Sequence, residues 1–274
     1  MTVVPLLEVS VAAAADALAS AFSTEGHPPS QWRLTLSQDL ETGRSDARVS
    51  MAALDGARVV GVCVAHVGEE PFGHIGSTGV RARYRGRGVG RLLVDGVLAA
   101  MERAGRTDVT LEVSADNASA VRLYTSLGFR RERELHTLTL ERAQLMNHGG
   151  SLLVTHRPAQ DEAFAAIAAL HTEVPAFQRR PHHLWTFRDE ATAIGVRRGT
   201  ALLGVALQRG AVLFDLAAVP EVAVVAALLR AALATTPALQ LIHVTEDDPL
   251  RAILEGLGAT HSLALDEYRW TDGG

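Results

Sequence analysis

The sequence predicts a mixed α/β fold, an α+β mixed sheet flanked by helices, that is built twice in tandem. Three observations lead to this prediction. Apolar runs with strand character alternate with segments whose apolar residues recur every three or four positions, as on one face of a helix. The order of these segments starts again after residue 150. A chain of 274 residues, 47% of them hydrophobic, has the length and apolar content for two domains, each with its own core.

The first half of the chain alternates between predicted strands and predicted helices. Strands are expected at 3–9, 47–54, 57–67, 73–80, 108–115 and 131–142. Helices are expected at 12–22, 32–40, 89–101 and 117–127. The turn residues Asp55 and Gly56 join the second and third strands as a hairpin, and Gly128 ends the last helix.

Residues 143–150 interrupt this pattern, and the same order then returns. Strands are expected at 151–158, 192–210 (as a hairpin), 211–219, 238–247 and 260–270. Helical segments are expected at 161–171, 182–189, 222–233 and 249–258. We therefore predict one domain at 1–143 and a second, related domain at 150–274.

Composition and charge exclude several classes of partner. All 26 basic residues are arginine, and the net charge of −5 gives no electrostatic basis for binding nucleic acid or a membrane. The single cysteine, Cys63, lies in an apolar run and is expected to be a buried strand residue rather than a nucleophile. No basic-then-apolar leader and no apolar run of about 18 residues is visible, so we expect a cytoplasmic protein.

The most unusual stretch lies between the fourth strand and the third helix. Five of the eleven residues from Arg81 to Arg91 are arginine and three are glycine. Glycines allow the backbone to approach a bound group closely, and a helix start presents unpaired N–H groups and the positive end of its dipole. This loop therefore predicts an anion site, most plausibly for phosphate. It fits neither the Walker pattern, which needs Lys and Ser/Thr at Arg91 and Leu92, nor the glycine spacing of a dinucleotide fingerprint.

The loop and a second motif together resemble a known family. The pattern Arg85-x-x-Gly88-x-Gly90, followed by residues 111–129, resembles the acetyl-CoA motifs of the GNAT N-acetyltransferase superfamily. The resemblance covers residues 1 to about 142, and residues 150–274 look like a degenerate second copy without the phosphate loop. It implies two tandem GNAT-like acyl-CoA N-acyltransferase domains. It also implies direct transfer of an acetyl group from acetyl-CoA to a primary amine of a small molecule or peptide.

The resemblance and the anion-binding argument together assign the acetyl-CoA site. The amides of residues 87–91 are expected to hold the pyrophosphate, and the side chain of Arg83, Arg85 or Arg87 to reach the ribose phosphate. Gly79 and Val80 are expected to pair with the pantetheine arm, as in the family, and Thr78 faces the same route. The assigned residues are Thr78, Gly79, Val80, Arg85, Gly86, Arg87, Gly88, Val89, Gly90, Arg91 and Asn117.

Catalysis is assigned to the helix that follows. Asn117 and Tyr124 are seven residues apart, which places them two turns apart on one face of the helix. A phenol is protonated at neutral pH, so Tyr124 is expected to protonate the departing thiolate as general acid. The amide of Val80 or Gly79 is the expected oxyanion donor. In the second copy Leu254 stands in place of Tyr124, and Asp247 or Asp248 in place of Asn117, so that copy is not expected to catalyse.

The general base has several candidates. His74 is expected to share a strand face with Thr78 by the two-residue period, and so to accept a proton from the amine. The loop residues Glu25, His27, Glu69 and Glu70 are alternatives. No metal is expected, because the adjacent histidines at 182 and 183 point to different faces and no third ligand is placed.

Two other functions and the assembly stay open at this stage. A non-enzymatic acyl-CoA-binding module is one alternative, and a nucleotide-binding oxidoreductase is the weaker one. The loop at 23–32 is expected to line the acceptor pocket. The second copy is expected either to pack on the first, giving a monomer with pseudo-dimeric tandem domains, or to leave room for a homodimer.

Overall fold

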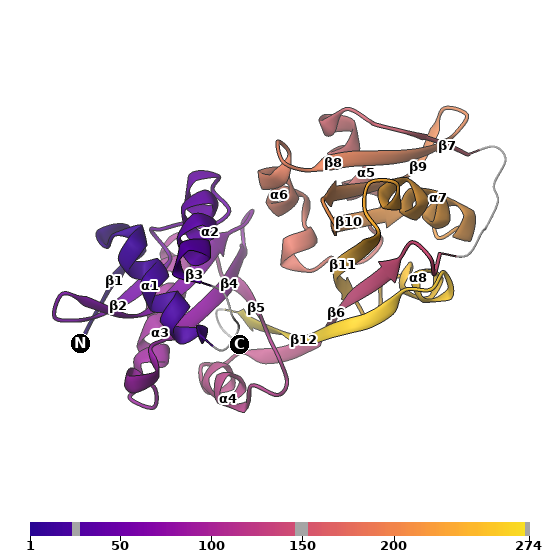
Figure 1. Ribbon diagram of the computed structural model, residues 1–274. Helices are drawn as coiled ribbons and strands as arrows, with labels where there is room; N and C mark the ends of the chain where they lie inside the picture. Colours follow the sequence, from indigo (N-terminus) through magenta and orange to yellow (C-terminus); the bar gives the residue numbers. More distant parts are fainter. Residues whose placement is uncertain (24–27, 146–152, 272–274) are drawn as a thin grey trace. The chain divides into compact units, whose positions relative to one another are not determined.

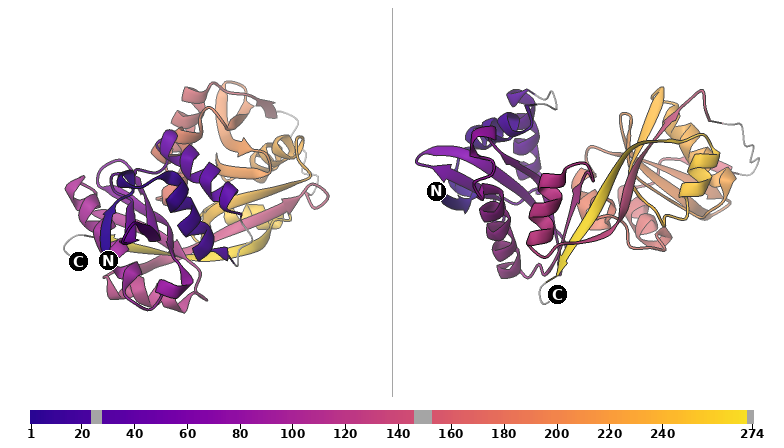
Figure 2. Two further views of the ribbon diagram at one scale, coloured as in Figure 1. Left: turned by 60° about the vertical axis from the view of Figure 1, so that its left-hand side comes forward. Right: turned by 90° about the horizontal axis from the view of Figure 1, so that it is seen from below.

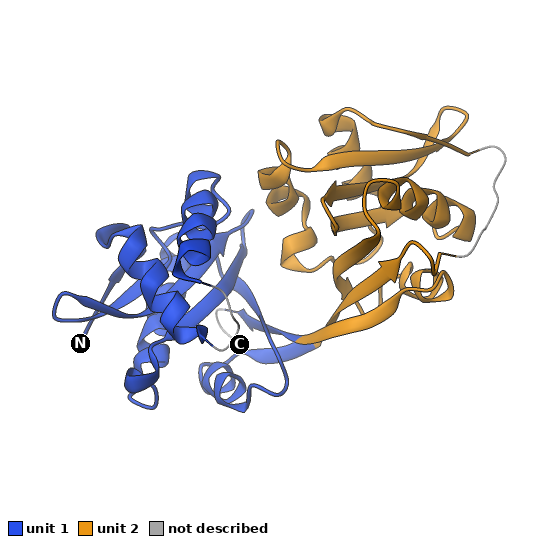
Figure 3. Cartoon of the chain, viewed as in Figure 1, with its two compact units in different colours: residues 1–132, 266–274 blue, residues 133–265 orange. Residues whose placement is uncertain are grey.

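A computed structural model describes residues 1–23, 28–145 and 153–271 of the chain. The chain divides into two compact units: unit 1 contains residues 1–132 and 266–274, and unit 2 contains residues 133–265 (Figures 1 and 3). No helix in the described part of the chain has the length and apolarity needed to cross a membrane.

Unit 1 follows the strand–helix order that the sequence predicts. Its strands are β1 (Thr2–Pro5), β2 (Met51–Asp55), β3 (Arg58–Val67), β4 (Phe72–Val80), β5 (Asp108–Val113) and the last part of β12 (Thr260–Thr271). Its helices are α1 (Val11–Ala21), α2 (Pro29–Glu41), α3 (Val89–Arg103) and α4 (Ala118–Ser126), with short 3-10 turns at Leu6–Glu8 and Ala82–Tyr84. The predicted first strand ends early because the chain turns into the 3-10 helix after Pro5.

The sheet of unit 1 opens at one end. Its strand order is β1-β2-β3-β4-β5-β12, and the neighbours are antiparallel except for β4 and β5. The parallel pairing of β4 with β5 joins Phe72–Ile75 to Asp108–Leu111 and does not continue along the second half of β4. The two strands therefore separate on the side where β4 ends, and this splay opens the sheet between them.

Helices cover both faces of this sheet, as the views in Figures 1 and 2 show. On one face α1 and α2 bury an apolar cluster that includes Leu18, Leu36 and Val62. On the other face α3 and α4 bury a second cluster, with Leu93 of α3, Tyr124 of α4 and Leu111 of β5. The alternation of strand side chains between the two faces places an apolar core on each side of the sheet.

Unit 2 repeats the order of elements. Its strands are β6 (Arg130–Glu141) from residue 133 onward, β7 (Leu153–His156), β8 (Thr192–Arg198), β9 (Ala201–Arg209), β10 (Val212–Ala218), β11 (Ala238–Thr245) and the first part of β12. Its helices are α5 (Gln160–Leu170), α6 (Pro181–Leu184), α7 (Val222–Leu233) and α8 (Arg251–Gly256), with 3-10 turns at Phe177–Arg179 and Trp185–Phe187. The strand order is β12-β6-β11-β10-β9-β8-β7.

The compact units differ from the predicted domains 1–143 and 150–274. Residues 135–141 of β6 pair with β11 inside unit 2, although β6 follows α4 of the first copy. Residues 266–271 of β12 pair with β5 inside unit 1, although β12 ends the second copy. The two copies have exchanged parts of their last strands. Local sequence patterns identify a strand but not the partner with which it pairs.

Candidate active site

The glycine loop has the backbone that its sequence predicts. Gly86 and Gly88 have φ angles of +71° and +77°, a left-handed conformation that favours glycine. Gly88 is the N-cap of α3 and supplies no side-chain cap, and the first backbone bond of the helix runs from the N–H of Leu92 to the carbonyl of Gly88 at 3.1 Å. The N–H groups of the first turn therefore have no partner within the helix, as an anion site requires.

This helix start lies on a cleft of about 530 Å³ at the splay of β4 and β5. The cleft is lined by Ala21, Phe22, Thr78, Gly79, Val80, Tyr84, Arg85, Gly86, Gly88, Val89, Gly90, Arg91, Asn117, Ser119, Ala120, Leu123 and Tyr124. Every residue assigned to acetyl-CoA from the sequence belongs to this lining except Arg87. The sequence did not single out Ala21, Phe22, Ser119 and Leu123, because no local motif marks them.

The arginine side chains have different roles. The guanidinium of Arg85 donates to the carbonyls of Ala21 (2.6 Å) and Val80 (3.0 Å), so it ties the end of α1 to the end of β4. Arg91 donates to the Ser126 hydroxyl at 3.1 Å. Arg83 and Arg87 lie over the ring of Tyr84, at 4.9 Å and 5.8 Å from its centroid. Arg85 thus shapes the cleft, and Arg83 and Arg87 are exposed beside Tyr84, which lines it.

Helix α4 presents Asn117 and Tyr124 to the cleft. Asn117 is its N-cap: the side-chain oxygen accepts from the N–H of Ala120 at 3.2 Å and from the Ser119 hydroxyl at 3.0 Å. This cap fixes the start of the helix, and two turns later Tyr124 lies 6% exposed among the lining residues. The expected common face of these two residues is confirmed.

The Tyr124 hydroxyl stays protonated over the physiological range. Burial raises the pKa of Tyr124 to about 12, the neighbouring Cys63 adds to the effect, and a hydrogen bond with Thr78 opposes it. Cys63 is itself buried, which raises its thiol pKa to about 12, and its sulfur lies 3.2 Å from the Thr78 hydroxyl. A thiol in this state is a poor nucleophile, so the cluster offers a proton donor and no reactive thiolate.

The end of β4 offers a backbone donor to the cleft. The N–H of Arg81 donates to the carbonyl of Val60 on β3 at 2.9 Å. Successive N–H groups of a strand point in opposite directions, so the N–H of Val80 points away from β3 and toward the splay. Between the two expected oxyanion donors, this geometry favours Val80 over Gly79.

His74 does not share a face with Thr78, and that expectation is wrong. The pairing of β3 with β4 shifts between Cys63↔Thr78 and Ala65↔Ile75, so β4 contains one extra residue there. Such a bulge reverses the alternation of side chains. Thr78 faces Cys63 and the cleft, whereas His74 is buried on the opposite face, 3.1 Å from the Thr110 hydroxyl and 3.4 Å from Glu112.

The other predicted bases lie elsewhere or outside the described residues. Glu69 and Glu70 precede β4 at the end opposite the cleft, more than about 20 Å from Thr78 at 3.3 Å per strand residue, and Glu70 binds Arg106. Glu25 and His27, with part of the predicted acceptor loop, lie outside the described residues. Within the described part of the chain, no histidine or carboxylate lines the cleft.

In unit 2 the corresponding splay is closed. The parallel pairing of β10 with β11 covers Val212–Leu213 and Gln240–Leu241, and a space of about 10 Å³ remains beyond it. The buried Arg179 occupies this place. Its guanidinium binds Asp215 of β10 at 2.7 Å, Asp248 at 2.8 Å and the carbonyls of Leu216 and His243 at 3.3 and 3.5 Å. No local motif marks this arginine, which bridges both strands.

Neighbouring charges hold Asp215 and His171 in their ionised forms. Burial alone would raise the pKa of Asp215, but the charges of Arg179 and His171 outweigh it, and the pKa is lowered. Burial alone would lower the pKa of His171, because it disfavours the charged imidazolium, but hydrogen bonds to Asp215 (3.0 Å) and Glu173 (3.2 Å) raise that pKa to about 9. The splay of unit 2 is thus filled by a compact network of paired charges.

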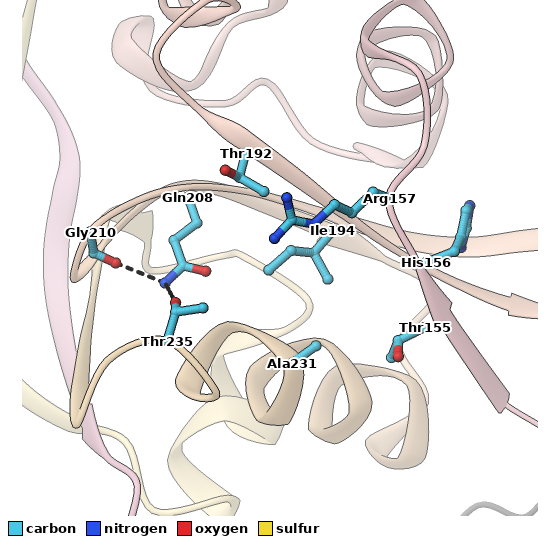
Figure 4. A pocket seen from close by; sticks show the side chains of 9 residues that line it. All are labelled: Thr155, His156, Arg157, Thr192, Ile194, Gln208, Gly210, Ala231 and Thr235. Atoms are coloured by element: carbon cyan, nitrogen blue, oxygen red, sulfur yellow. Dashed lines mark hydrogen bonds between the residues drawn. The ribbon is translucent and has the colours of Figure 1, made fainter.

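A second hollow, of about 460 Å³, lies in unit 2 beside the second half of α7 (Figure 4). Its Gln208 amide donates to the carbonyl of Gly210 (2.8 Å) and to the Thr235 hydroxyl (3.4 Å). It lies away from the β10–β11 splay and does not correspond to the cleft of unit 1.

The paired histidines of α6, His182 and His183, contact the ring of Phe177. The described residues contain no cluster of three or more metal-ligating side chains.

Fold and cleft together define an α/β protein with an open cleft at the glycine-rich start of α3. Residues 12–129 match the Acetyltransferase (GNAT) family. These residues of unit 1 form a GNAT acetyltransferase domain, and the resemblance seen in the sequence is confirmed there.

Relatives by sequence include acetyltransferases. N-alpha-acetyltransferase 30 of Schizosaccharomyces pombe is 32% identical over 91 residues, 32% of this chain and 61% of that protein. Mycothiol acetyltransferase of Actinosynnema mirum is 38% identical over 87 residues, 31% of this chain and 29% of that protein. The aligned parts thus span less than two thirds of these relatives.

Solved structures share the tandem fold. A tandem GNAT protein from the clavulanic acid biosynthesis pathway superposes with a TM-score of 0.71 at 17% identity, covering 100% of this chain and 99% of that chain. A putative acetyltransferase from Pyrococcus horikoshii gives a TM-score of 0.71 at 15% identity, covering 96% and 86%. The predicted fold class, a mixed α/β tandem GNAT fold, is confirmed.

Proposed function

We propose that unit 1 is an acetyl-CoA-dependent N-acetyltransferase that acetylates a primary amine of a small molecule or peptide. The observation that carries the proposal is the cleft at the β4–β5 splay, with the uncapped start of α3 at one end and Tyr124 in its wall. The family of residues 12–129 supports acetyl-CoA as the donor. The proposed site residues are those of the cleft together with Arg87.

The cleft fits the chemistry of coenzyme A. A Cβ on Gly86 or Gly88 would meet no protein atom within 4 Å, so the loop leaves open space for a bound group beside its N–H donors. The cleft volume of about 530 Å³ is in the range of small-molecule sites. The first-turn amides of α3 would hold the pyrophosphate, and the exposed Arg83 or Arg87 beside Tyr84 would reach the ribose phosphate. The separated end of β4 would pair with the amides of the pantetheine arm.

Each residue of the site then has a defined task. Acetyl-CoA supplies an activated acetyl carbonyl as a thioester. The N–H of Val80 would donate to the carbonyl oxygen as negative charge develops there. An amine nitrogen forms the new C–N bond while the C–S bond breaks, and Tyr124 would give its hydroxyl proton to the departing sulfur. The amine nitrogen becomes positively charged as the C–N bond forms and gives its extra proton to water, which leaves a neutral amide; the phenolate is reprotonated from solvent.

The acceptor is proposed to be a primary amine. The name of the matched N-alpha-acetyltransferase 30 gives an α-amino group as the acceptor of that protein, so the peptide α-amino group is the first candidate here. Unit 2 is proposed to be inactive toward acetyl-CoA, because Arg179 fills its splay and Leu254 stands in place of the tyrosine.

Replacing Tyr124 by phenylalanine is expected to lower kcat by about 100-fold or more, the usual contribution of general acid catalysis. The KM for acetyl-CoA should stay within about threefold, because the hydroxyl acts on the leaving sulfur and not on the bound nucleotide. Steady-state kinetics at saturating acceptor measure both values. A Tyr124→Phe variant with the wild-type kcat, where chemistry limits the rate, would remove Tyr124 from the mechanism.

The pH profile gives a second check on the same residue. The acid form of Tyr124 is the active one, and its pKa is raised to about 12, so its contribution is lost only as the pH rises through that value. Wild-type kcat should therefore show no falling limb from this group between pH 7 and about pH 10. A fall in kcat near pH 10 that disappears in Tyr124→Phe would contradict the buried, protonated state.

The function itself is tested with a panel of amines. The purified chain is incubated with acetyl-CoA and a peptide with an unblocked α-amino group, the same peptide with a blocked N-terminus, or a small diamine. Release of the CoA thiol and the mass of the product are followed. Amine-dependent thiol release with a mass gain of one acetyl group supports the proposal. Binding of acetyl-CoA without transfer to any primary amine would favour the acyl-CoA-binding alternative.

A further inference from the structure

The strand that completes the sheet of unit 1 is encoded at the far end of the chain. Residues 266–271 of β12 pair in antiparallel register with β5, from Asp266↔Val113 to Thr271↔Asp108 (Figure 3). Arg269 holds this register with two bonds to the carboxylate of Asp108, at 2.8 and 2.6 Å. A bidentate pair of this kind fixes direction as well as distance. The strand is therefore a firmly placed part of unit 1.

The inner face of this strand packs against the helix that carries Tyr124. Side chains two residues apart share a strand face, so Tyr268 and Trp270 point the same way. Tyr268 is 7% exposed and belongs to one apolar cluster with Tyr124 and Phe129, while Trp270 packs against the edge of that cluster. The ring of Phe129 meets the ring of Tyr124 edge-on, with centroids 5.8 Å apart.

The end of α4 rests on Trp270. The position that a Cβ on Gly128 would take lies 3.6 Å from Cδ1 of the indole, so the backbone after α4 is in close contact with the ring. The N–H of Phe129 donates to the carbonyl of Tyr124 at 3.1 Å, which links this contact to the backbone of the tyrosine itself. The strand that follows α4 along the chain pairs with β11 in unit 2, so the support beside β5 comes from β12.

We propose that Trp270, with Tyr268 beside it, is a positioning residue of the unit 1 site: it holds α4 so that the Tyr124 hydroxyl faces the splay. The inference rests on the proposed function for its effect on catalysis, and on the contacts alone for its effect on α4. The site of unit 1 then depends on residues 266–271, the last six residues of β12. A displacement of about 1 Å at a reacting group can lower the rate by a factor of about 100, so a shift of α4 is expected to lower kcat.

The test uses the full chain and three substitutions in one strand. Trp270→Ala removes the support, Trp270→Phe keeps an aromatic ring, and Leu263→Ala is a matched control at an exposed position of β12 in unit 2. Hydrogen exchange of the amides of 118–126 reports on α4 without any chemistry. Steady-state kinetics report kcat and the KM for acetyl-CoA.

In Trp270→Ala, exchange in α4 is expected to rise by about tenfold or more, while exchange in β3 stays unchanged. The kcat is expected to fall by about 10- to 100-fold, with the KM for acetyl-CoA within about threefold. Trp270→Phe should recover most of the kcat, and Leu263→Ala should match the wild type. If Trp270→Ala does not fold, Trp270→Leu takes its place with the same expectations.

Three results would overturn the proposal. Unchanged α4 exchange in a folded Trp270→Ala would show that the ring does not hold the helix. Faster exchange throughout unit 1 would show a general structural role, and increased α4 exchange with the wild-type kcat would show that the helix position does not matter to catalysis. A wild-type chain that transfers no acetyl group would refute the proposed function, and with it the catalytic part of the claim. The exchange data would still decide whether Trp270 holds α4.

Discussion

Replacing Gly88 by valine is expected to weaken acetyl-CoA binding by about 100-fold or more while unit 1 stays folded. Gly88 has a φ of +77°, which a β-branched residue adopts only with strain, so the loop would change its backbone at the helix start. Two or more charge-assisted bonds to the pyrophosphate would be lost at about 1.5–3 kcal/mol each, which corresponds to about two to four orders of magnitude in affinity. Isothermal titration with acetyl-CoA measures the change.

The control for this variant is Gly43→Val. Gly43 has nearly the same φ, +74°, and a Cβ there also meets no protein atom within 4 Å, but it lies in the turn after α2, away from the cleft. Both variants therefore carry a similar backbone strain. Equal loss of binding in the two would show that strain in unit 1, rather than the loop, is responsible. Unchanged acetyl-CoA affinity in a folded Gly88→Val would refute the assignment of this loop as the pyrophosphate site.

Replacing Arg179 by alanine is expected to destabilise unit 2 by about 3–5 kcal/mol, because it leaves uncompensated charge in a buried site. The guanidinium pairs with both Asp215 and Asp248, whose side chains are 0% and 4% exposed. Without it two carboxylates would lie close together with His171 as the remaining counter-charge. Urea unfolding, followed separately by circular dichroism and by exchange in α7, measures the loss.

Arg198→Ala is the matched control in the same unit. Arg198 pairs with Glu221, but both side chains are almost half exposed, so water and salt screen the pair and its loss should be much smaller. Acetyl-CoA affinity of unit 1 should be unchanged in both variants. If Arg179→Ala unfolded at the same urea concentration as Arg198→Ala, the network would not be what closes the splay of unit 2.

Local backbone demands explain why so much of the site could be predicted. A loop with left-handed backbone positions before a helix favours glycine at those positions. Gly86 and Gly88 occupy them, so the sequence alone indicates the loop. The spacing of Asn117 and Tyr124 follows from the helical repeat, and the Asn cap marks where the helix begins. The structure places all of these residues on one cleft.

Features that depend on distant parts of the chain were not predictable. One extra residue in β4 separates His74 from the face of Thr78, and the two-residue period assumes that no such residue is present. The pairing of β12 with β5 joins segments about 150 residues apart, and a strand pattern does not name its partner. Nothing in the local sequence distinguishes Arg179 from the other arginines. Its role depends on Asp215 and Asp248, which only the fold places beside it.

We propose that the splay of unit 1, and not that of unit 2, is the acetyl-CoA site. Isothermal titration of the full chain with acetyl-CoA tests this assignment, because the stoichiometry counts the sites. One site per chain is expected for the wild type and for Arg198→Ala, and none in the same concentration range for Gly88→Val. Two sites per chain, no binding to the wild type, or one site that persists with full affinity in Gly88→Val would refute the assignment of the site to unit 1.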